Sequence, residues 1–361
     1  MTETKTTKTR ELSVEGIQKP GIVKQLMPLA LTLVIFVWLY FTIDFSQMFR
    51  ILGQAKLNYF IPCLIGFVIM LAIIDAFTFG QAYSWFCTRL TTYEKLEIRI
   101  APYVIQVVFA PLVEVLFLLY LWRKSKVPPT RAMSASIWTI VNDYAALATA
   151  ITIAVIYNHQ NKLVPQINIY WLITVIVFWV FYFSNLIFWH SSLQPRIAAW
   201  VERSHITRFN RQATDSLFLK IAGGAIQLLH TFSIARWYHY LFVYGLRVLA
   251  VVGILVSNYA ALKALDINVT PALAIIAIPL IYTGYFLPIN IGGFGGPQAL
   301  ALLFFYEIGH CGSKEQIIAY SFLWSTGFLV CRFFLGLIFI HGFWQNAFPE
   351  GFTKWFRRNS S

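Results

Sequence analysis

FLPINIGGFGGPQALALLFF, from Phe286 to Phe305, is an apolar run that helix-breaking residues interrupt at its centre. The breakers are Pro288, Gly292, Gly293, Gly295, Gly296 and Pro297. The apolar stretch from Pro271 onward could span a bilayer, but proline removes a backbone donor and glycine is a poor helix former. Irregular backbone at membrane depth persists only where protein buries it or where it lines a watery cavity. The run therefore predicts a broken helix at a transport site, with a simple extramembrane loop as the alternative.

The composition indicates an integral membrane protein. Of the 361 residues, 58% are hydrophobic and 12% are charged, whereas ordinary soluble domains carry about 25% charged residues. Apolar runs near the length of a membrane span recur along the chain, which is typical of a polytopic membrane protein. The four cysteines lie far apart, and their spacing suggests neither a metal site nor a disulfide. We expect no cofactor.

The chain is expected to form one transmembrane domain over residues 26–343, between a disordered cytoplasmic N-terminus (1–25) and a basic cytoplasmic tail (344–361). The predicted spans are 26–43, 58–85, 133–157, 167–189, 238–262 and 316–343. An interfacial elbow helix is expected at 44–56 and a second at 217–234, the latter with a true span as its alternative. Residues 87–99 are interpreted as a polar link.

Two further apolar segments, 100–122 and 271–306, are interrupted by proline or glycine. The halves 26–157 and 167–343 then share one order of span, elbow, span, broken segment and span. If each broken segment leaves the membrane on the side from which it entered, each half crosses the membrane an odd number of times. The two halves are then inverted relative to each other, as in secondary transporters. The predicted fold is an all-α polytopic membrane protein, an inverted repeat with two re-entrant broken-helix hairpins.

The distribution of charge favours one orientation. With the N-terminus inside, the cytoplasmic pieces hold 21 of the 28 Lys and Arg residues, as the positive-inside rule requires. We therefore expect a bacterial inner membrane protein with both termini in the cytoplasm. The net charge of +13 does not indicate nucleic-acid binding, because the basic residues are spread over loops without an interleaved aromatic platform.

Ionisable side chains inside a membrane are costly and mark functional positions. In this chain they are Asp75, Glu114, Asp143, Arg247 and Arg332. We expect the two arginines to pair with two of the acids, either to bind a substrate headgroup or only to lock helices together. Glu114, which follows Pro111, is a candidate for binding a proton during transport, and a glutamate that simply faces the cytoplasmic vestibule is the alternative.

The tip of the second broken segment suits an anionic headgroup. Helix N-termini point backbone N–H groups outward and attract phosphate or carboxylate. Asn290 and Gln298 would add neutral hydrogen-bond donors there, and Arg247 or Arg332 would supply positive charge. Enzymatic motifs are missing from the sequence: it has no HExxH, no Cys/His metal cluster and no GxSxG elbow.

The run PINIGGFG, Pro288 to Gly295, resembles the P-x-x-x-G-G-x-G signature of the lysylphosphatidylglycerol synthase transmembrane, or flippase-like, family. Pro111 with Glu114 looks like the broken segment of that family, and Asp143 looks like its acidic residue in the next span. The sequence departs from the family at Gln298, where a glutamate is usual. Thr139 and Ile140 stand where the family has a Glu-Arg pair.

The resemblance implies movement of a phospholipid, polyprenyl-phosphate or lipid-linked sugar between leaflets, without a synthase domain. We therefore expect a flippase, not an enzyme, whose substrate is a membrane lipid with an anionic headgroup. Two alternatives stay open. One is a membrane glycosyltransferase that uses a polyprenyl-linked donor and depends on Asp44 or Glu114. The other is a non-transporting partner in the assembly of a cell-envelope polymer.

Overall fold

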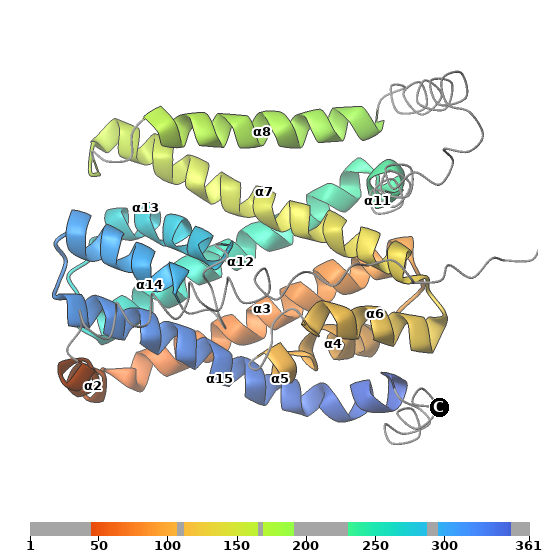
Figure 1. Cartoon of the computed structure of the whole chain (residues 1–361), viewed down its shortest axis with the longest axis horizontal. Helices are drawn as coiled ribbons and strands as arrows, with labels where there is room; N and C mark the ends of the chain where they lie inside the picture. Colours follow the sequence, from red (N-terminus) through yellow and green to blue (C-terminus); the bar gives the residue numbers. More distant parts are fainter. Residues whose placement is uncertain (1–44, 107–111, 165–168, 191–229, 287–294, 348–361) are drawn as a thin grey trace, which may run out of the picture.

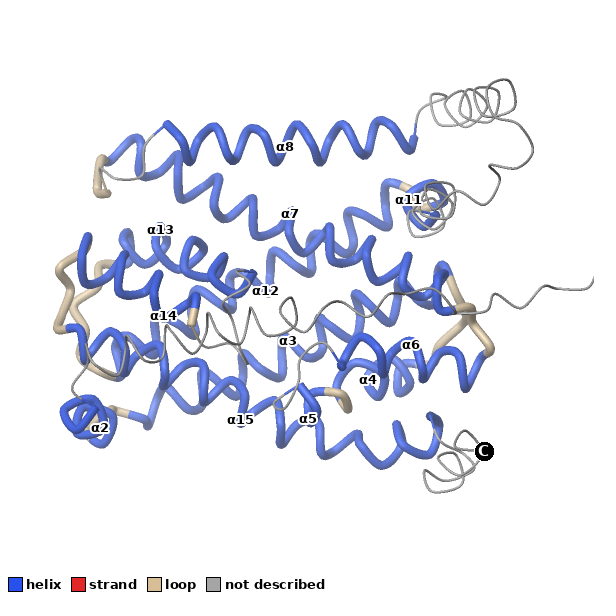
Figure 2. Tube along the Cα trace, in the orientation of Figure 1, coloured by secondary structure: helices blue, strands red, loops and turns tan. Residues whose placement is uncertain are grey.

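The computed structural model describes residues 45–106, 112–164, 169–190, 230–286 and 295–347. In this part of the chain all the regular secondary structure is helical, with no strand (Figure 2). The predicted first span, 26–43, and most of the second elbow, 217–229, lie outside the described residues. From the second elbow the structure includes α11 (His230–Ile234), a single short helix.

Four helices are long and apolar enough to cross a membrane, which confirms four of the predicted spans. They are α3 (Leu57–Phe86), α7 (Pro129–Asn161), α12 (Trp237–Ala264) and α15 (Lys314–Ala347). All four run along the long axis of the molecule (Figure 1). A further apolar helix, α8 (Ile169–His190), lies along α7 at the edge of the bundle, where span 167–189 is expected.

The core lies around α3, which contacts α4, α7, α12 and α15. One side of α3 buries Phe67, Val68 and Leu71 in the bundle, whereas Ile65, Ile69 and Ile73 are 44–45% exposed on the outer side. These isoleucines recur every four residues and therefore share one helix face. An exposed apolar face on a long apolar helix is what contact with lipid requires. The chain is an all-α membrane protein.

The predicted elbow at 44–56 is a short helix, α2 (Phe45–Gly53). The interpretation of 87–99 as a polar link is wrong, because this segment contains α4 (Thr92–Ile100). Thr91 caps that helix reciprocally: Glu94 N donates to Thr91 Oγ1 (3.3 Å) and Thr91 N donates to Glu94 Oε2 (2.7 Å). Helix α4 packs along α3 and buries Glu97 and Ile98. A capped, amphipathic stretch has therefore folded where polarity alone suggested a loop.

Both interrupted segments break near the middle of the bundle (Figure 1). The first continues from α4 into α5 (Tyr103–Gln106) and returns as α6 (Leu112–Ser125). The second consists of α13 (Pro271–Tyr282), the 3₁₀-helix η2 (Thr283–Phe286), α14 (Gly296–Ala301) and the π-helix η3 (Leu302–Ile308). Each begins and ends at one end of the molecule, and the two use opposite ends.

Two glycines let the arms of the second broken segment touch. A Cβ on Gly296 would lie 2.2 Å from the carbonyl oxygen of Gly284, so no larger residue fits without movement. Gly295 has φ 113°, which L side chains rarely adopt. Gln298 is fully buried, and its Oε1 accepts a hydrogen bond from Gly295 N at 2.7 Å. Gly295 and Gln298 thus have structural roles at the start of α14.

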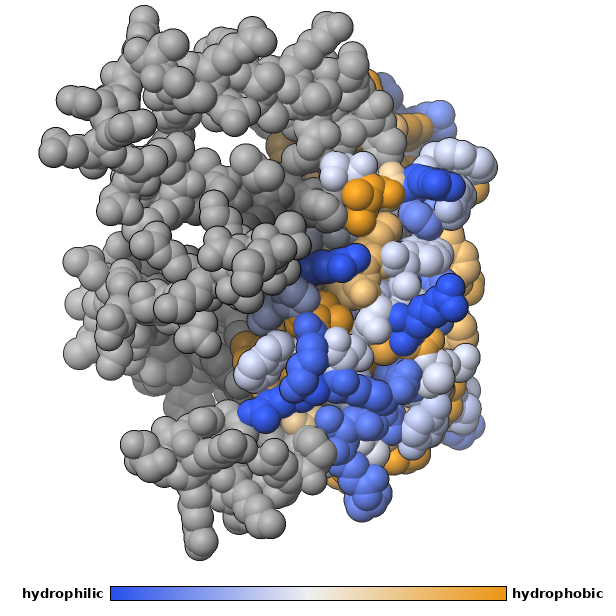
Figure 3. Space-filling model, turned by 90° about the vertical axis from the view of Figure 1, so that its right-hand side faces the viewer, coloured by the Kyte–Doolittle hydropathy of each residue, from blue (hydrophilic) through white to orange (hydrophobic). Residues whose placement is uncertain are grey.

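Hydrophilic side chains gather at the end of the molecule where α3 ends and α7 begins (Figure 3). The loops and adjoining helix turns at that end carry Arg89, Lys95, Arg123, Lys124, Lys126, Arg131 and Arg236. The loops and adjoining helix turns at the opposite end carry Arg50, Lys56, Lys162, Lys263 and Lys314. Apart from Arg99, Arg247 and Arg332, the Lys and Arg residues of the described chain therefore lie toward the two ends of an apolar bundle, as expected for a protein that crosses a membrane.

Candidate functional site

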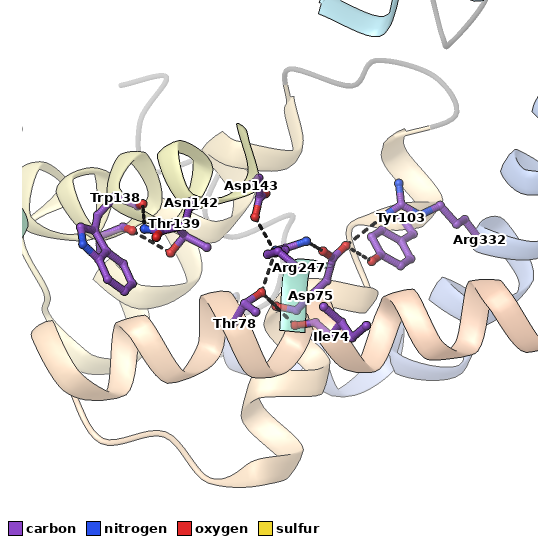
Figure 4. A network of polar contacts seen from close by, with 11 residues as sticks. Ile74, Asp75, Thr78, Tyr103, Trp138, Thr139, Asn142, Asp143, Arg247 and Arg332 are labelled. Carbon is purple, nitrogen blue, oxygen red and sulfur yellow. Dashed lines mark hydrogen bonds and ion pairs between the residues drawn. The ribbon is translucent and has the colours of Figure 1, made fainter. Parts of the chain in front are cut away.

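Asp75 lies at the centre of a buried cluster of charges in the middle of the bundle (Figure 4). Its Oδ1 lies 2.6 Å from Arg247 Nη1, and its Oδ2 lies 3.1 Å from Arg332 Nη2. The hydroxyl of Tyr103 also donates to Asp75 Oδ2 at 2.6 Å. Asp75 is only 4% exposed. One carboxylate from α3 therefore joins α5, α12 and α15.

Arg247 on α12 connects two acids. Besides Asp75, its Nε lies 2.5 Å from Asp143 Oδ1 on α7, and its Nη2 donates to Thr78 Oγ1 at 2.6 Å. The planar guanidinium can hold several acceptors at fixed angles, which a lysine ammonium cannot do. The Thr78 hydroxyl donates to the carbonyl of Ile74 at 2.8 Å, which orients its oxygen to accept. Helices α3, α7 and α12 are therefore held together by one side chain.

Arg332 on α15 connects the cluster to the first broken segment. Its Nη1 donates to Gln106 Oε1 at 2.8 Å, and Gln106 is the last residue of α5. Its guanidinium carbon lies 3.9 Å from the centroid of the Tyr103 ring and 4.7 Å from that of Phe328. Such cation–π contacts stabilise a buried guanidinium. The end of α5 is therefore fixed to α15.

The expected pairing of the two arginines with two acids is confirmed: the acids are Asp75 and Asp143. Removing one partner from a buried ion pair leaves an uncompensated charge, which is strongly destabilising. The cluster thus has a structural role in holding five elements together: α3, α5, α7, α12 and α15. Its place halfway along membrane-spanning helices also makes it the candidate functional site, because charges at that depth are otherwise avoided.

A cavity of about 270 Å³ opens beside the cluster. We call it the charged cavity; Arg99, Asp143, Arg247, Phe79, Tyr144 and Leu147 contribute to its lining. The guanidinium carbon of Arg99, on α4, lies 3.7 Å from the centroid of the Phe79 ring. Asp143 is more accessible than its partner: 29% of the Asp143 side chain is exposed, compared with 8% of the Arg247 side chain. A polar ligand in this cavity would meet two guanidinium groups and one carboxylate.

Only some of the predicted residues of the two broken segments can be placed relative to this site. Tyr282, the last residue of α13, lines the charged cavity. Gln298 is not brought to the cluster; its amide nitrogen lies 3.5 Å from Ser325 Oγ on α15. Glu114 belongs to the first turn of α6, but its side chain is not among those described. Pro111, Pro288, Asn290, Gly292 and Gly293 lie outside the described residues.

The sequence did not predict several residues of the site. Arg99 falls within the predicted polar link, and no functional role was predicted for Thr78, Tyr103 or Gln106. The capping pattern of Thr91 and Glu94 was a signal that a helix begins there and could carry Arg99 into the bundle. The neutral residues Thr78 and Gln106 carry no such signal, because their role depends on which helices become neighbours.

The charged residues of α4 also link it to α6. Glu94 forms an ion pair with Lys124. Partial burial raises the pKa of the Glu94 carboxyl, but hydrogen bonds from Lys124 and Thr91 outweigh burial, and the pKa is below its usual range. Buried Glu97 accepts from the hydroxyl of Tyr120 (3.1 Å) and from Asn346 Nδ2 (2.9 Å). These contacts fix α4, and with it Arg99, against α6 and α15.

In comparisons with known proteins, no family model matches the chain, and neither a curated protein nor a solved structure matches it. The resemblance of PINIGGFG to the flippase-like family therefore stays a prediction from the motif. Among the described residues, no group of three or more His, Cys, Asp or Glu side chains is placed to hold a metal ion.

Proposed function

We propose that this chain is a membrane transporter that moves a lipid with an anionic headgroup between leaflets. The observation that carries the proposal is the charged cavity itself: two guanidinium groups and a carboxylate beside a cavity halfway along apolar helices. A polar cavity at that depth has little use in a passive membrane anchor. Guanidinium groups are well suited to phosphate oxygens.

The arrangement of the broken segments supports a transport role. In our proposal they are re-entrant hairpins related by an inverted repeat, which enter from opposite sides of the membrane. Their helices run to the middle of the bundle and return to the end at which they began. Gln106 from the first contacts the cluster, and Tyr282 from the second lines the charged cavity. Transporters of inverted topology place their binding sites at such an interface of broken helices.

We further propose a bacterial inner membrane location with both termini in the cytoplasm. In this orientation the end of the bundle where α3 ends and α7 begins faces the cytoplasm. More of the described Lys and Arg residues lie in the loops and adjoining helix turns at that end than at the other, in agreement with the positive-inside rule. The lipid headgroup would then cross between the two hairpins while its chains stay in the bilayer.

The test is translocation by purified protein in liposomes, with phosphatidylglycerol and a polyprenyl-phosphate sugar as substrates. We expect Gly293→Val to abolish translocation, because a β-branched residue stiffens the tip of the second hairpin, while the protein stays folded. Gly66→Val in α3 is the matched control, because a Cβ there meets nothing within 4 Å. Transport unchanged by Gly293→Val would reject the hairpin tip as part of the path.

The same experiment separates the alternatives. A glycosyltransferase would convert the polyprenyl-linked sugar into a covalent product and would depend on Asp44 or Glu114. A non-transporting assembly partner would leave all lipids in their original leaflet, and polar substitutions in the cavity would be harmless. Folded protein that translocates neither lipid would count against the proposed function.

A further inference from the structure

A second, apolar pocket adjoins the charged cavity. It has a volume of about 540 Å³ and lies between α7, α8 and η2, with Ala148, Trp171, Val175 and Phe178 in its lining. We call it the chain pocket. Tyr144 and Leu147 of α7 line both this pocket and the charged cavity. These two residues of α7 therefore lie between the charged cavity and the apolar chain pocket.

From this juxtaposition we infer that the two cavities together form a binding site for one lipid. The anionic headgroup lies against Arg99 and Arg247, and one acyl or prenyl chain lies in the chain pocket. The inference rests on the proposed function and deepens it, because it names the residues that bind the substrate. The two volumes together fall in the range of about 300–1,000 Å³ that is usual for ligand sites.

The surroundings indicate that the occupant is a lipid. The chain pocket lies among apolar helices whose outer faces carry exposed large side chains, such as Val177 (61%) and Phe181 (70%) on α8. Hydrocarbon is the solvent that such faces require. A larger groove between α8 and α12, about 620 Å³, shares no lining residue with the charged cavity. The chain pocket, which does share residues, is therefore the one placed to receive the tail of a lipid whose headgroup is in the cavity.

Arg99 is the residue that the inference assigns to headgroup selection. Arg247 binds Asp75, Asp143 and Thr78 and so holds three helices together, which means that its replacement would disturb the fold as well as any bound headgroup. Arg99 comes from a different element, α4, and lies over Phe79 at the wall of the cavity. Asp143 lines the same cavity, and its negative charge would repel a headgroup that carries more than one negative charge. The site is therefore matched to a headgroup with one phosphodiester rather than to a polyanion.

Lipid binding by the full-length protein, measured by native mass spectrometry from detergent, tests the inference. The probes are phosphatidylglycerol, phosphatidylcholine and glycerophosphoglycerol, which is the phosphatidylglycerol headgroup without its acyl chains. Both lipids carry one phosphodiester, but phosphatidylcholine adds a positive charge that would lie beside the guanidinium groups of Arg99 and Arg247. We therefore expect phosphatidylglycerol to bind roughly tenfold more tightly than phosphatidylcholine. Glycerophosphoglycerol, which lacks chains, should bind far more weakly than phosphatidylglycerol. Equal binding of glycerophosphoglycerol and phosphatidylglycerol would overturn the inference.

Two variants probe the two cavities separately. Arg99→Gln should reduce the affinity for phosphatidylglycerol to that for phosphatidylcholine, and Arg99→Lys, which keeps the charge, should retain most of the preference. Ala148→Phe fills the chain pocket and should weaken both lipids at least about tenfold. The matched controls are Arg89→Gln in an exposed position of the connection and Ile153→Phe on the exposed face of α7. Wild-type lipid binding by Ala148→Phe would overturn the inference.

Failure of this inference can be distinguished from failure of the proposed function. If Arg99→Gln and Ala148→Phe translocate and bind phosphatidylglycerol as wild type does, the protein is a transporter but this is not its binding site. If the wild type binds lipid with the expected pattern but does not translocate it, the binding site stands and the transport function falls. Thermal unfolding of each variant identifies any that do not fold, in which case Arg99→Lys and Leu147→Phe provide the comparison.

Discussion

Arg332 and Asp75 are 257 positions apart in the sequence, yet Arg332 Nη2 lies 3.1 Å from Asp75 Oδ2 in the middle of the bundle. This pair joins a helix from each predicted half of the chain, α3 and α15. Tyr103 from the first broken segment contacts both partners: its hydroxyl donates to Asp75, and its ring lies under the guanidinium of Arg332. The cluster thus joins the two predicted halves in the middle of the bundle.

Replacement of Asp75 by asparagine should destabilise the protein strongly. It would leave the guanidinium groups of Arg247 and Arg332 short of one negative charge, and breaking a buried ion pair costs about 3–5 kcal/mol. We expect a large fall in the Tm of the purified protein in detergent. Asp266→Asn, which removes the exposed partner of Lys56, is the control and should change the Tm little. Equal effects of the two substitutions would argue against the structural role of Asp75.

Tyr103→Phe should have a smaller effect of the same sign. The ring, and with it the cation–π contact to Arg332, is retained, but Asp75 loses a hydrogen bond from a fully enclosed hydroxyl. A lost buried hydrogen bond costs about 1–3 kcal/mol. Tyr59→Phe, at a residue that is 40% exposed, serves as the control. A fall in Tm no greater than that of the control would contradict the bonding assigned to Tyr103.

Gly296→Ala should disturb the second broken segment. The added methyl carbon would lie 2.2 Å from the carbonyl oxygen of Gly284, so the two arms must separate. Such overpacking costs about 1–3 kcal/mol. Gly66→Ala on α3 meets nothing within 4 Å and should be neutral or stabilising by up to about 1 kcal/mol. The thermal stabilities of the two variants should therefore shift in opposite directions or by clearly different amounts, and matching shifts would refute the close packing of the arms.

The ion pair of Glu94 should make stability depend on pH. Because the folded-state pKa of this carboxyl is below its usual range, its contribution is complete above the ordinary pKa of about 4.3. The contribution is lost as pH falls through the folded-state pKa. Glu94→Gln keeps a capping side chain but removes the charge, so it should be less stable than wild type at neutral pH by about 1 kcal/mol or less, after allowance for solvent screening.

The check is the difference in Tm between wild type and Glu94→Gln, measured from neutral pH down to about pH 3. We expect the difference to shrink toward zero at the acidic end. A difference that stays constant over this range would show that the charge of Glu94 contributes nothing.

The sequence predicted those features that depend on local pattern. Hydropathy and length located α3, α7, α12 and α15, since a span needs a continuous apolar run. Proline and glycine indicated that neither 100–122 nor 271–306 is one helix, and the described residues of each segment do form separate short helices. The pairing of Arg247 and Arg332 with acids was also predictable, as an unpaired charge among apolar helices is too costly to keep.

What the sequence could not specify was which helices would become neighbours and how each would be rotated. Asp75 receives two arginines, Tyr103 lies under one of them, and Arg99 reaches the cavity wall. These contacts depend on the packing of α3, α4, α12 and α15 together. The error at 87–99 has a different cause. Polarity was given more weight than the capping pattern of Thr91 and Glu94, although that pattern favours a helix.

The most direct test of the account is the leaflet exchange of phosphatidylglycerol by wild-type protein in liposomes. A fluorescent acyl-chain label is destroyed by a membrane-impermeant reductant only in the outer leaflet. If the protein translocates the lipid, the destroyed fraction should rise from about half, as expected for a symmetric bilayer without transport, toward completion as the number of protein copies per vesicle increases. Glu114→Gln, measured in parallel, shows whether that carboxyl takes part. A destroyed fraction that stays at the protein-free value, with folded protein in the vesicles, would contradict the account.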